Sequence, residues 1–198
     1  MIKKLNELIG KDDLEGNCMY IHKSNFILRK GNEIEKLRRN LVKLGEMNNK
    51  IIEVGFNGGH SCALMAQKNP KAEFLLFDIG RWSYTQRCID YFKTIFKAEY
   101  VKGNSNKTIL EYKGTDKYDL IHVDGGHGLK TAENDIRNCK KFANETTLLL
   151  VDDSNFKRIR DLLDSMIKTD YLTEIEMESM DCETTKYHRL FNYSFQKK

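Results

Sequence analysis

The stretch of residues 50–66, KIIEVGFNGGHSCALMA, constrains the fold of this chain more than any other. An apolar run at residues 51–54 predicts a strand that is buried on both faces. Three glycines follow within residues 55–59, and glycine adopts positive φ readily and lets a ligand approach the backbone closely. From Ser61 onward the apolar residues recur at helical spacing. A strand, a tight glycine turn and a helix N-terminus in this order predict a site for a nucleotide-like ligand.

Patterns of strand and helix alternate from residue 50 to the end of the chain. Predicted strands cover residues 50–54, 72–78, 98–103, 118–124, 146–153, 171–178 and 187–195. Amphipathic helices are predicted over residues 84–96, 108–112, 129–142 and 156–167. Because such alternation produces a parallel sheet covered on both faces, we expect an α/β, Rossmann-like, doubly wound fold. Sheets of this kind bind ligands at the carboxyl ends of their strands.

Residues 1–48 form a predicted N-terminal helical extension of a Rossmann-like core that spans residues 49–198. A short helix is predicted over residues 2–9. A longer one is predicted from Asn32 to Leu44, with Gly45 as its expected stop. Residues 18–30 have a mixed pattern that indicates a loop. At 198 residues, the chain is expected to form one domain, 1–198.

Composition excludes several classes of protein. The net charge of +4 is small and dispersed, without the basic run of a nucleic-acid patch, so we expect no nucleic-acid partner. No apolar run approaches the roughly 20 residues that span a membrane, and no signal core is present at the N-terminus. The five cysteines are odd in number and lack C-x-x-C spacing, which argues against zinc or disulfides and for a reduced, cytoplasmic setting. Formation of a homo-oligomer stays open.

Asp78 ends the second predicted strand, 19 residues after Gly59. A carboxylate at this place can accept hydrogen bonds from the two ribose hydroxyls of a nucleoside, although a strand-end Asp can also cap the following turn. The glycine spacing differs from the G-x-G-x-x-G pattern of dinucleotide sites. Glu53 precedes the first glycine by two residues and would repel a pyrophosphate. It suits a ligand with a positive charge, or it orders the loop.

Several motifs together resemble the class I S-adenosylmethionine-dependent methyltransferases. They are E-V-G-F-N-G-G-H-S, F-D at the second strand, Y-D-L-I-H-V-D-G-G-H and L-L-L-V-D-D-S. The last two resemble the small-molecule O-methyltransferase branch that includes the macrocin-type sugar methyltransferases. The resemblance covers roughly residues 51–155. It implies a mostly parallel sheet of seven strands with the last strand antiparallel.

The resemblance also implies a role for individual residues. S-adenosylmethionine would be the cofactor, with its methionine part over the glycine loop, its ribose at the second strand and its adenine at the third. The implied cofactor-binding residues are Glu53, Gly55, Phe56, Asn57, Gly59, Ser61, Asp78, Ile79, Asn104, Ser105 and Asp124. Relatives often carry Asp where this chain has Asn104, and an amide can still bond the adenine amino group.

Asp124 ends the fourth predicted strand, and Asp152 and Asp153 end the fifth, which is its neighbour in this fold. Carboxylates that converge repel one another unless they are protonated or bind a cation. Oxygen ligands suit a hard ion, so Mg²⁺ or a similar divalent cation is the predicted occupant. Such an ion would bind two oxygens of a substrate diol and lower the pKa of the hydroxyl to be methylated. The alternative is that Asp152 and Asp153 cap the following helix.

His127 lies three residues after Asp124, in a loop with three glycines. An imidazole with an ordinary pKa near 6.5 suits a general base, and His127 is predicted to have this role. Asp124 is the second predicted catalytic residue. A loop histidine that only packs is the alternative. His122, inside the fourth strand, is predicted to lie in the core. His60 is predicted to help start the helix, although contact with the cofactor stays open.

The function predicted from these residues is transfer of a methyl group to a hydroxyl of a small molecule, such as a sugar or another vicinal diol. A methyltransferase that acts on nitrogen or nucleic acid is an alternative, but the chain lacks an N/D-P-P-Y-type motif after the fourth strand. A catalytically inactive cofactor-binding protein is a second alternative. An NAD-dependent reductase fits least, because its glycine spacing differs. The sequence does not name the substrate.

Overall fold

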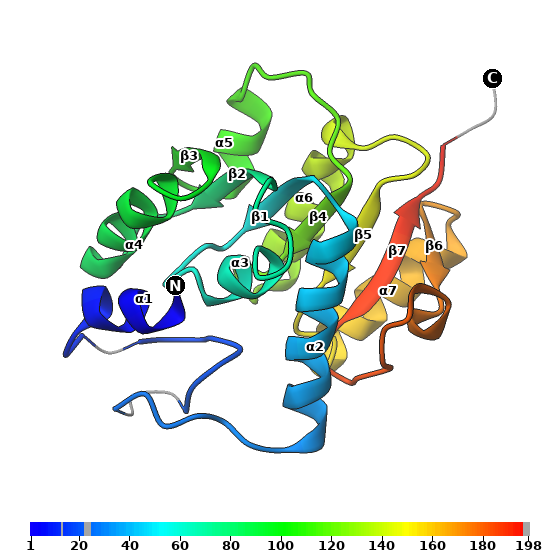
Figure 1. The fold of residues 1–198 in the computed structure, drawn as a ribbon. Coiled ribbons are helices and arrows are strands. Elements are labelled where there is room, and N and C mark those ends of the chain that lie inside the picture. The colour runs from blue at the N-terminus through cyan, green and yellow to red at the C-terminus, as the bar shows by residue number, and fades with distance from the viewer. Residues whose placement is uncertain (13, 22–24, 196–198) are drawn as a thin grey trace.

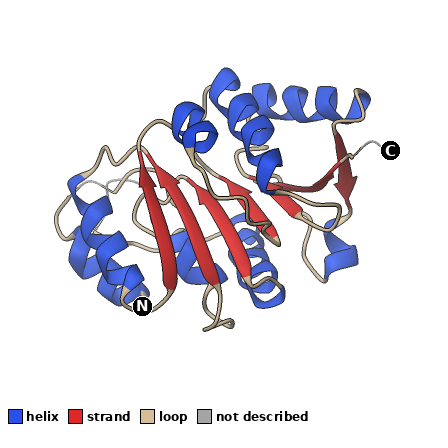
Figure 2. Ribbon diagram, turned by 90° about the horizontal axis from the view of Figure 1, so that it is seen from above, coloured by secondary structure: helices blue, strands red, loops and turns tan. Residues whose placement is uncertain are grey.

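In the part of the chain that the structure describes, seven strands form one twisted sheet, and helices cover both of its faces (Figures 1 and 2). The computed structural model describes residues 1–12, 14–21 and 25–195. The strands are β1 (Lys50–Val54), β2 (Glu73–Asp78), β3 (Lys97–Lys102), β4 (Leu120–Val123), β5 (Leu148–Val151), β6 (Leu172–Ile175) and β7 (Arg189–Tyr193). The helices are α1 (Ile2–Ile9), α2 (Asn32–Met47), α3 (His60–Met65), α4 (Ser83–Lys93), α5 (Ser105–Glu111), α6 (Leu129–Cys139) and α7 (Lys157–Lys168).

The strand order is β3-β2-β1-β4-β5-β7-β6, and β7 runs antiparallel to both of its neighbours. The order reverses at β1, where β2 pairs on one side and β4 on the other. A doubly wound sheet binds ligands at such a switch point, above the carboxyl ends of its strands. The predicted fold class is therefore confirmed, including the antiparallel last strand.

Each face of the sheet has its own apolar cluster, because successive strand residues point to opposite faces. Ile51 of β1 packs with residues of α1 to α4, whereas Ile52 packs with residues of α5 to α7. Leu5 of α1 and Leu41 of α2 are almost fully buried in the first cluster. The N-terminal extension therefore shares the core of the sheet.

Helix α2 continues through the predicted stop at Gly45 and ends at Met47, so that prediction was wrong. A Cβ atom at Gly45 would lie 1.9 Å from the carbonyl oxygen of Met65. The glycine is needed because α2 and α3 cross closely here. In a sequence, a glycine at a close helix crossing looks the same as a glycine at a helix end.

Two short 3-10 helices, Lys140–Phe142 and Met177–Met180, complete the described elements. The region of residues 18–30 was predicted to be a loop, and its described part contains one isolated antiparallel bridge, Tyr20 to Leu28. In the described part of the chain, no helix combines the length and apolar character needed to cross a membrane.

Candidate functional site

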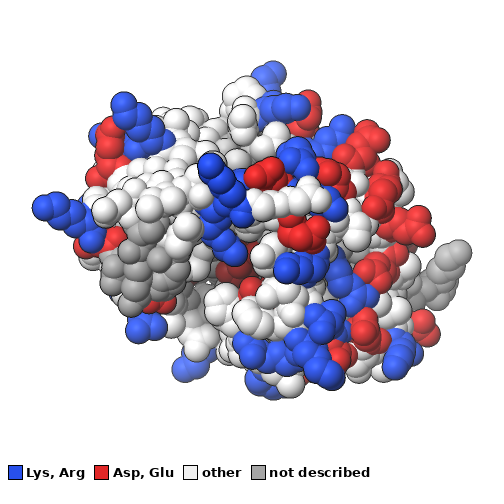
Figure 3. All heavy atoms as spheres, turned by 90° about the horizontal axis from the view of Figure 1, so that it is seen from below, with Lys and Arg blue, Asp and Glu red and all other residues white. Residues whose placement is uncertain are grey.

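A cavity of about 710 Å³ lies at the carboxyl ends of the central strands. Its acidic lining residues are Glu15, Asp78, Asp124, Asp152 and Asp153. On the face shown in Figure 3, acidic atoms lie inside a hollow and basic side chains stand beside its mouth. The predicted site residues that line the cavity are Gly55, Phe56, Asn57, Ser61, Asp78, Ile79, Asn104, Ser105, Asp124, His127, Asp152 and Asp153.

The glycine loop after β1 is held tightly against the end of β4. Gly55 has a φ of 101°, and a Cβ atom there would lie 2.0 Å from the carbonyl oxygen of Asp124. Gly59 has a φ of 76° and precedes α3, where a side chain would collide with the ring of Phe56. Both positions therefore require glycine. Gly59 shapes the loop but is not among the residues that line the cavity.

Glu53 is fully buried behind the cavity wall, which it does not line. Ser61 Oγ and Cys62 Sγ donate hydrogen bonds to its carboxylate, and Nδ1 of His122 lies 3.1 Å from Oε1. These contacts fix the start of α3 against β1. Glu53 thus orders the loop, one of the roles that the sequence left open for it. Its implied role toward the cofactor stays a prediction.

Asp78 holds two loops at the end of β2. Its Oδ2 accepts a hydrogen bond from the backbone N–H of Asn57 (2.8 Å), and its Oδ1 accepts one from Gly80 (2.6 Å). The carboxylate therefore caps the following turn, as the alternative required, and it also lines the cavity. Each oxygen has a second lone pair, so the geometry is compatible with bonds to ribose hydroxyls.

The third strand end presents a capping residue to the same cavity. Oδ1 of Asn104 accepts a hydrogen bond from the backbone N–H of Asn106 at 3.0 Å and so caps α5. The amide nitrogen of Asn104 makes no hydrogen bond within the described chain. Adenine contacts at Asn104 and Ser105 stay predictions.

Residues of the N-terminal segment also line the cavity, which the sequence did not predict. Cys18 and Arg29 belong to the lining, and so does Tyr187 from the loop before β7. The side chain of Asn57 donates hydrogen bonds to the carbonyl oxygens of Glu15 and, at 2.6 Å, of Gly16. These bonds tie the glycine loop to the segment. No periodicity or motif marks irregular chain of this kind, so the sequence carried no signal for it.

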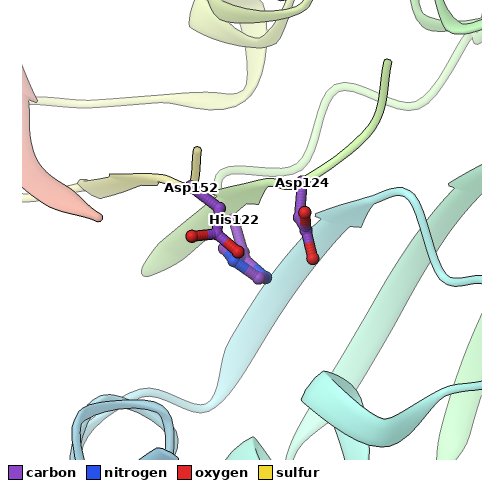
Figure 4. A group of neighbouring side chains, drawn as sticks. All are labelled: His122, Asp124 and Asp152. Carbon is purple, nitrogen blue, oxygen red and sulfur yellow. The ribbon is translucent and has the colours of Figure 1, made fainter. Parts of the chain in front are cut away.

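Asp124 and Asp152 lie side by side just beyond the ends of β4 and β5, with His122 beside them (Figure 4). One ligand atom from each of the three residues lies within 4.8 Å of the other two. Burial raises the pKa of Asp124 well above its usual range, and the nearby Asp152 raises it further. In the described chain, no Lys or Arg forms an ion pair with Asp124 or Asp152. The donor atoms and the unbalanced negative charge fit a divalent cation.

Asp153, the third predicted metal ligand, is placed differently. Its carboxylate shares a hydrogen bond with Nδ1 of His127, and it is not part of the three-residue donor group. This bond holds the pKa of His127 above its usual range. Neither Asp152 nor Asp153 caps α7, because Phe156 is its N-cap residue and makes no side-chain capping bond. The capping alternative is therefore excluded.

His122 is buried, as predicted for a core residue, yet it is also part of the donor group. This second property was not predicted from the sequence. The signal was present, because His122 precedes Asp124 by two residues and side chains two apart on a strand share a face. His60 is buried at the start of α3, where its Nε2 lies 2.9 Å from Oδ1 of Asn6.

The sheet order, the glycine loop and the cavity at the switch point define a protein of the Rossmann-like fold, with its cavity where such sheets bind ligands. The sequence family described as "methyltransferase domain" matches residues 52–154, which is just over half of the 198 residues. The chain therefore belongs to this family of methyltransferase domains. No protein of curated function matches the chain in sequence.

Solved structures of methyltransferases share the fold at low sequence identity. The O-methyltransferase TomG of Streptomyces achromogenes, solved with S-adenosylmethionine, has 16% identity and a TM-score of 0.62 over 98% of this chain and 89% of that chain. A TDP-rhamnose 3′-O-methyltransferase of calicheamicin biosynthesis has 12% identity and a TM-score of 0.61 over 84% and 82% of the two chains.

The N-methyltransferase NodS of Bradyrhizobium japonicum, solved with S-adenosylhomocysteine, has 16% identity and a TM-score of 0.57 over 98% of both chains. At these identities the likeness concerns the fold. Family and fold confirm the predicted resemblance to methyltransferases, and the macrocin-type branch stays a prediction.

Proposed function

We propose that this protein is an S-adenosylmethionine-dependent O-methyltransferase that acts on a hydroxyl of a small molecule, such as a sugar or another vicinal diol. The observation that carries the proposal is the pairing of His127 with Asp153 beside Asp124 and Asp152, on the wall of a cavity that also holds the glycine loop. The cavity volume lies within the roughly 300–1,000 Å³ of small-molecule sites. The family is one of methyltransferase domains.

The cofactor would occupy the side of the cavity between the glycine loop and the ends of β2 and β3. Gly55, Phe56 and Asn57 would lie under its methionine part, with Ser61 at the helix start. Asp78 and Ile79 would hold the ribose, and Asn104 and Ser105 would flank the adenine. When bound, S-adenosylmethionine supplies a sulfonium methyl group that an oxygen nucleophile can displace in line.

His127 would act as the general base. Its Nδ1 is fixed by Asp153, so Nε2 is the nitrogen left to accept a proton from the substrate hydroxyl. The Asp153 carboxylate would stabilise the imidazolium that forms. Its fixed hydrogen bond also keeps the ring in one orientation, and much of the rate would come from such positioning.

Asp124 and Asp152 would hold a divalent cation. A cation bound there supplies positive charge that orients a diol and lowers the pKa of the hydroxyl it binds. The two carboxylates, held at neighbouring strand ends, would fix its place relative to His127. This assignment moves Asp153 from the predicted ligands to the partner of His127.

The remaining walls would select the acceptor. Arg29 and Tyr187 lie together, with the guanidinium carbon 5.9 Å from the ring centre. Phe156 lies beside His127, with their ring centres 6.3 Å apart. Flat apolar rings next to polar groups suit the mixed surface of a sugar or an aromatic diol. The TDP-rhamnose 3′-O-methyltransferase, which has the same fold, supports the choice of a sugar as the methyl acceptor.

Two measurements test this function in sequence. Calorimetry should show binding of S-adenosylhomocysteine, weakened by Asp78→Ala and unchanged by Asp90→Ala, an exposed control on α4. Labelled methyl groups should then transfer from S-adenosylmethionine to a member of a panel of sugars and catechols. Failure to bind the cofactor would refute the proposal at its base.

The same labelled assay separates the alternatives. The N-methyltransferase NodS has the same fold, so amines belong in the panel. Transfer to amines alone would make the protein an N-methyltransferase. Binding without transfer to any acceptor would favour a cofactor-binding protein that lacks catalysis.

A further inference from the structure

His122 occupies a strand position where the fold calls for an apolar side chain. It lies in β4 on the same sheet face as Leu120, which belongs to the apolar cluster under α1 to α4. Its register partner on β1 is Glu53, and the two side chains are only 2% and 0% exposed. Burying two polar groups here costs free energy, unless they serve each other or a ligand.

Glu53 determines which nitrogen of His122 is free. The Glu53 carboxylate accepts bonds from Ser61 and Cys62, so His122 Nδ1, at 3.1 Å from Oε1, is a donor to the same group. A neutral imidazole with its proton on Nδ1 has a lone pair on Nε2. No hydrogen bond to Nε2 occurs within the described chain.

This arrangement is the one that metal-binding histidines adopt. Such a histidine gives one nitrogen to the metal and its other ring N–H to a carboxylate, which fixes the tautomer and the ring. The carboxylate behind His122 is therefore an observation independent of the two aspartates in front of it. A buried Glu–His pair that only stabilises the core would not need the imidazole to lie among the donor atoms of Asp124 and Asp152.

We propose that His122 is a ligand of the cation held by Asp124 and Asp152, and that this cation is a borderline transition metal such as Co²⁺ or Zn²⁺ rather than Mg²⁺. The inference rests on the metal site of the proposed function. Magnesium binds to oxygen ligands and water, whereas imidazole suits transition metals. A donor set with one imidazole and two carboxylates selects the second group of ions.

Metal binding to the chelator-treated protein tests the proposal without any activity measurement. Calorimetry with each metal salt alone should show Co²⁺ and Zn²⁺ binding at least about a hundredfold more tightly than Mg²⁺. Pulsed electron paramagnetic resonance of the Mn²⁺-loaded protein should show coupling to a histidine nitrogen. Labelling histidine with ¹⁵N should change that coupling.

Variants identify the histidine. His122→Gln should abolish the nitrogen coupling and the preference over Mg²⁺, and His122→Asn serves if the first variant does not fold. His60→Gln is the matched control, because His60 is also buried on this face but bonds to Asn6. Glu53→Gln should weaken Co²⁺ binding by about 10–100-fold, the range for partners behind a ligand.

Two outcomes would overturn the inference. Coupling that persists in both His122 variants would assign the nitrogen to another histidine. Binding of Mg²⁺ as tight as that of Co²⁺, without nitrogen coupling, would leave an all-oxygen site. Neither outcome would contradict the methyltransferase proposal, which depends on cofactor binding and methyl transfer. Conversely, failure to bind S-adenosylhomocysteine would leave these metal measurements valid.

Discussion

Nδ1 of His127, in the loop after β4, shares a hydrogen bond with the carboxylate of Asp153, just beyond β5. Asp153 has a φ of 62°, a left-handed conformation that Asp tolerates better than most residues. This conformation separates the directions of two consecutive acids, so that Asp152 lies beside Asp124 while Asp153 contacts His127. One dipeptide thereby serves two neighbouring parts of the site.

Replacement of His127 tests the general base. His127→Ala should lower kcat by about 10²–10⁴, the usual contribution of such a group. Affinity for S-adenosylhomocysteine should not change, because the expected cofactor contacts lie on the glycine loop, β2 and β3. The side chain is 55% exposed, so folding should be unaffected. The rate is measured with labelled methyl groups and the acceptor found in the panel.

Asp153→Asn should cause a smaller loss of kcat, since Asn tolerates the same backbone conformation but cannot stabilise an imidazolium. Full activity in both the His127 and Asp153 variants would show that another group takes the proton.

Gly55→Ala tests the close approach of the glycine loop to β4. The new Cβ atom would lie 2.0 Å from the Asp124 carbonyl oxygen, so the backbone must move in addition to accepting a φ of 101°. We expect loss of more than about 3 kcal/mol of unfolding free energy, above the usual 1–3 kcal/mol for strained backbone alone. Urea unfolding measures it.

Gly31→Ala is the matched control for Gly55. Its φ is 130°, yet nothing lies within 4 Å of a Cβ atom there, so it reports strain without collision. Equal losses in the two variants would mean that the contact with Asp124 has no energetic consequence.

Much of the fold follows from residues 50–66 and the alternating patterns after them. The positions of Gly55 and Asp78 at strand ends follow from strand length alone, because parallel strands end on one edge of the sheet. The end of α2 was predicted wrongly at Gly45, because a glycine is needed there for the close contact with Met65 of another helix. A contact between elements leaves no periodic signal in either of them.

The site could be predicted less completely than the fold. Asp124 and Asp152 could be assigned to the site from the sequence because each lies at the carboxyl end of a predicted strand. The role of Glu53 depends on which of its neighbours reach it, and three side chains from α3 and β4 do so. Asp153 turns away through one positive φ angle, which no residue pattern indicates. Cys18 and Arg29 come from irregular chain, where tertiary contacts alone decide the path.

Asn57→Gly tests the connection between the glycine loop and the N-terminal segment. Asn57 has a φ of 50°, so glycine removes the side chain without adding strain. The lost bonds to Glu15 and Gly16 should increase amide hydrogen exchange in residues 14–20, at a cost near 1 kcal/mol for each bond. Weaker binding of S-adenosylhomocysteine should follow, because this segment walls the cavity.

Tyr84→Phe removes the bond from the tyrosine hydroxyl to Oδ1 of Asn57, at 2.7 Å, and the interaction of that hydroxyl with the backbone of Glu15. It leaves both bonds from Asn57 to the segment in place, so it should have a smaller effect. Exchange rates that stay unchanged in both variants would show that the segment is held elsewhere, for example by the bonds from Arg38 to the carbonyl oxygens of Cys18 and Arg29.

Asp135 of α6 should make stability depend on pH in a direction opposite to that of most carboxylates. Its side chain is fully buried beside Gly125, and the Ser105 hydroxyl only partly offsets the effect of burial on its pKa. Burial raises its pKa to about 6, against a value near 3.9 in unfolded chains. The folded state therefore binds this proton more tightly, so its contribution to stability is present below pH 4 and lost as pH rises to about 6.

The difference between the folded and unfolded pKa values of Asp135 corresponds to about 2–3 kcal/mol of unfolding free energy. Asp135→Asn, which stays neutral, should raise the unfolding free energy by up to this amount at pH 7.5 and by only about a third of it at pH 4.5. Buried His60 and His188 have lowered pKa values, of about 4 and 3, so they destabilise the fold as pH falls below 6.5. Because they are present in both proteins, the difference between variant and wild type in urea unfolding isolates Asp135. A difference that is constant from pH 4.5 to 7.5 would mean that Asp135 keeps an ordinary pKa in the folded protein.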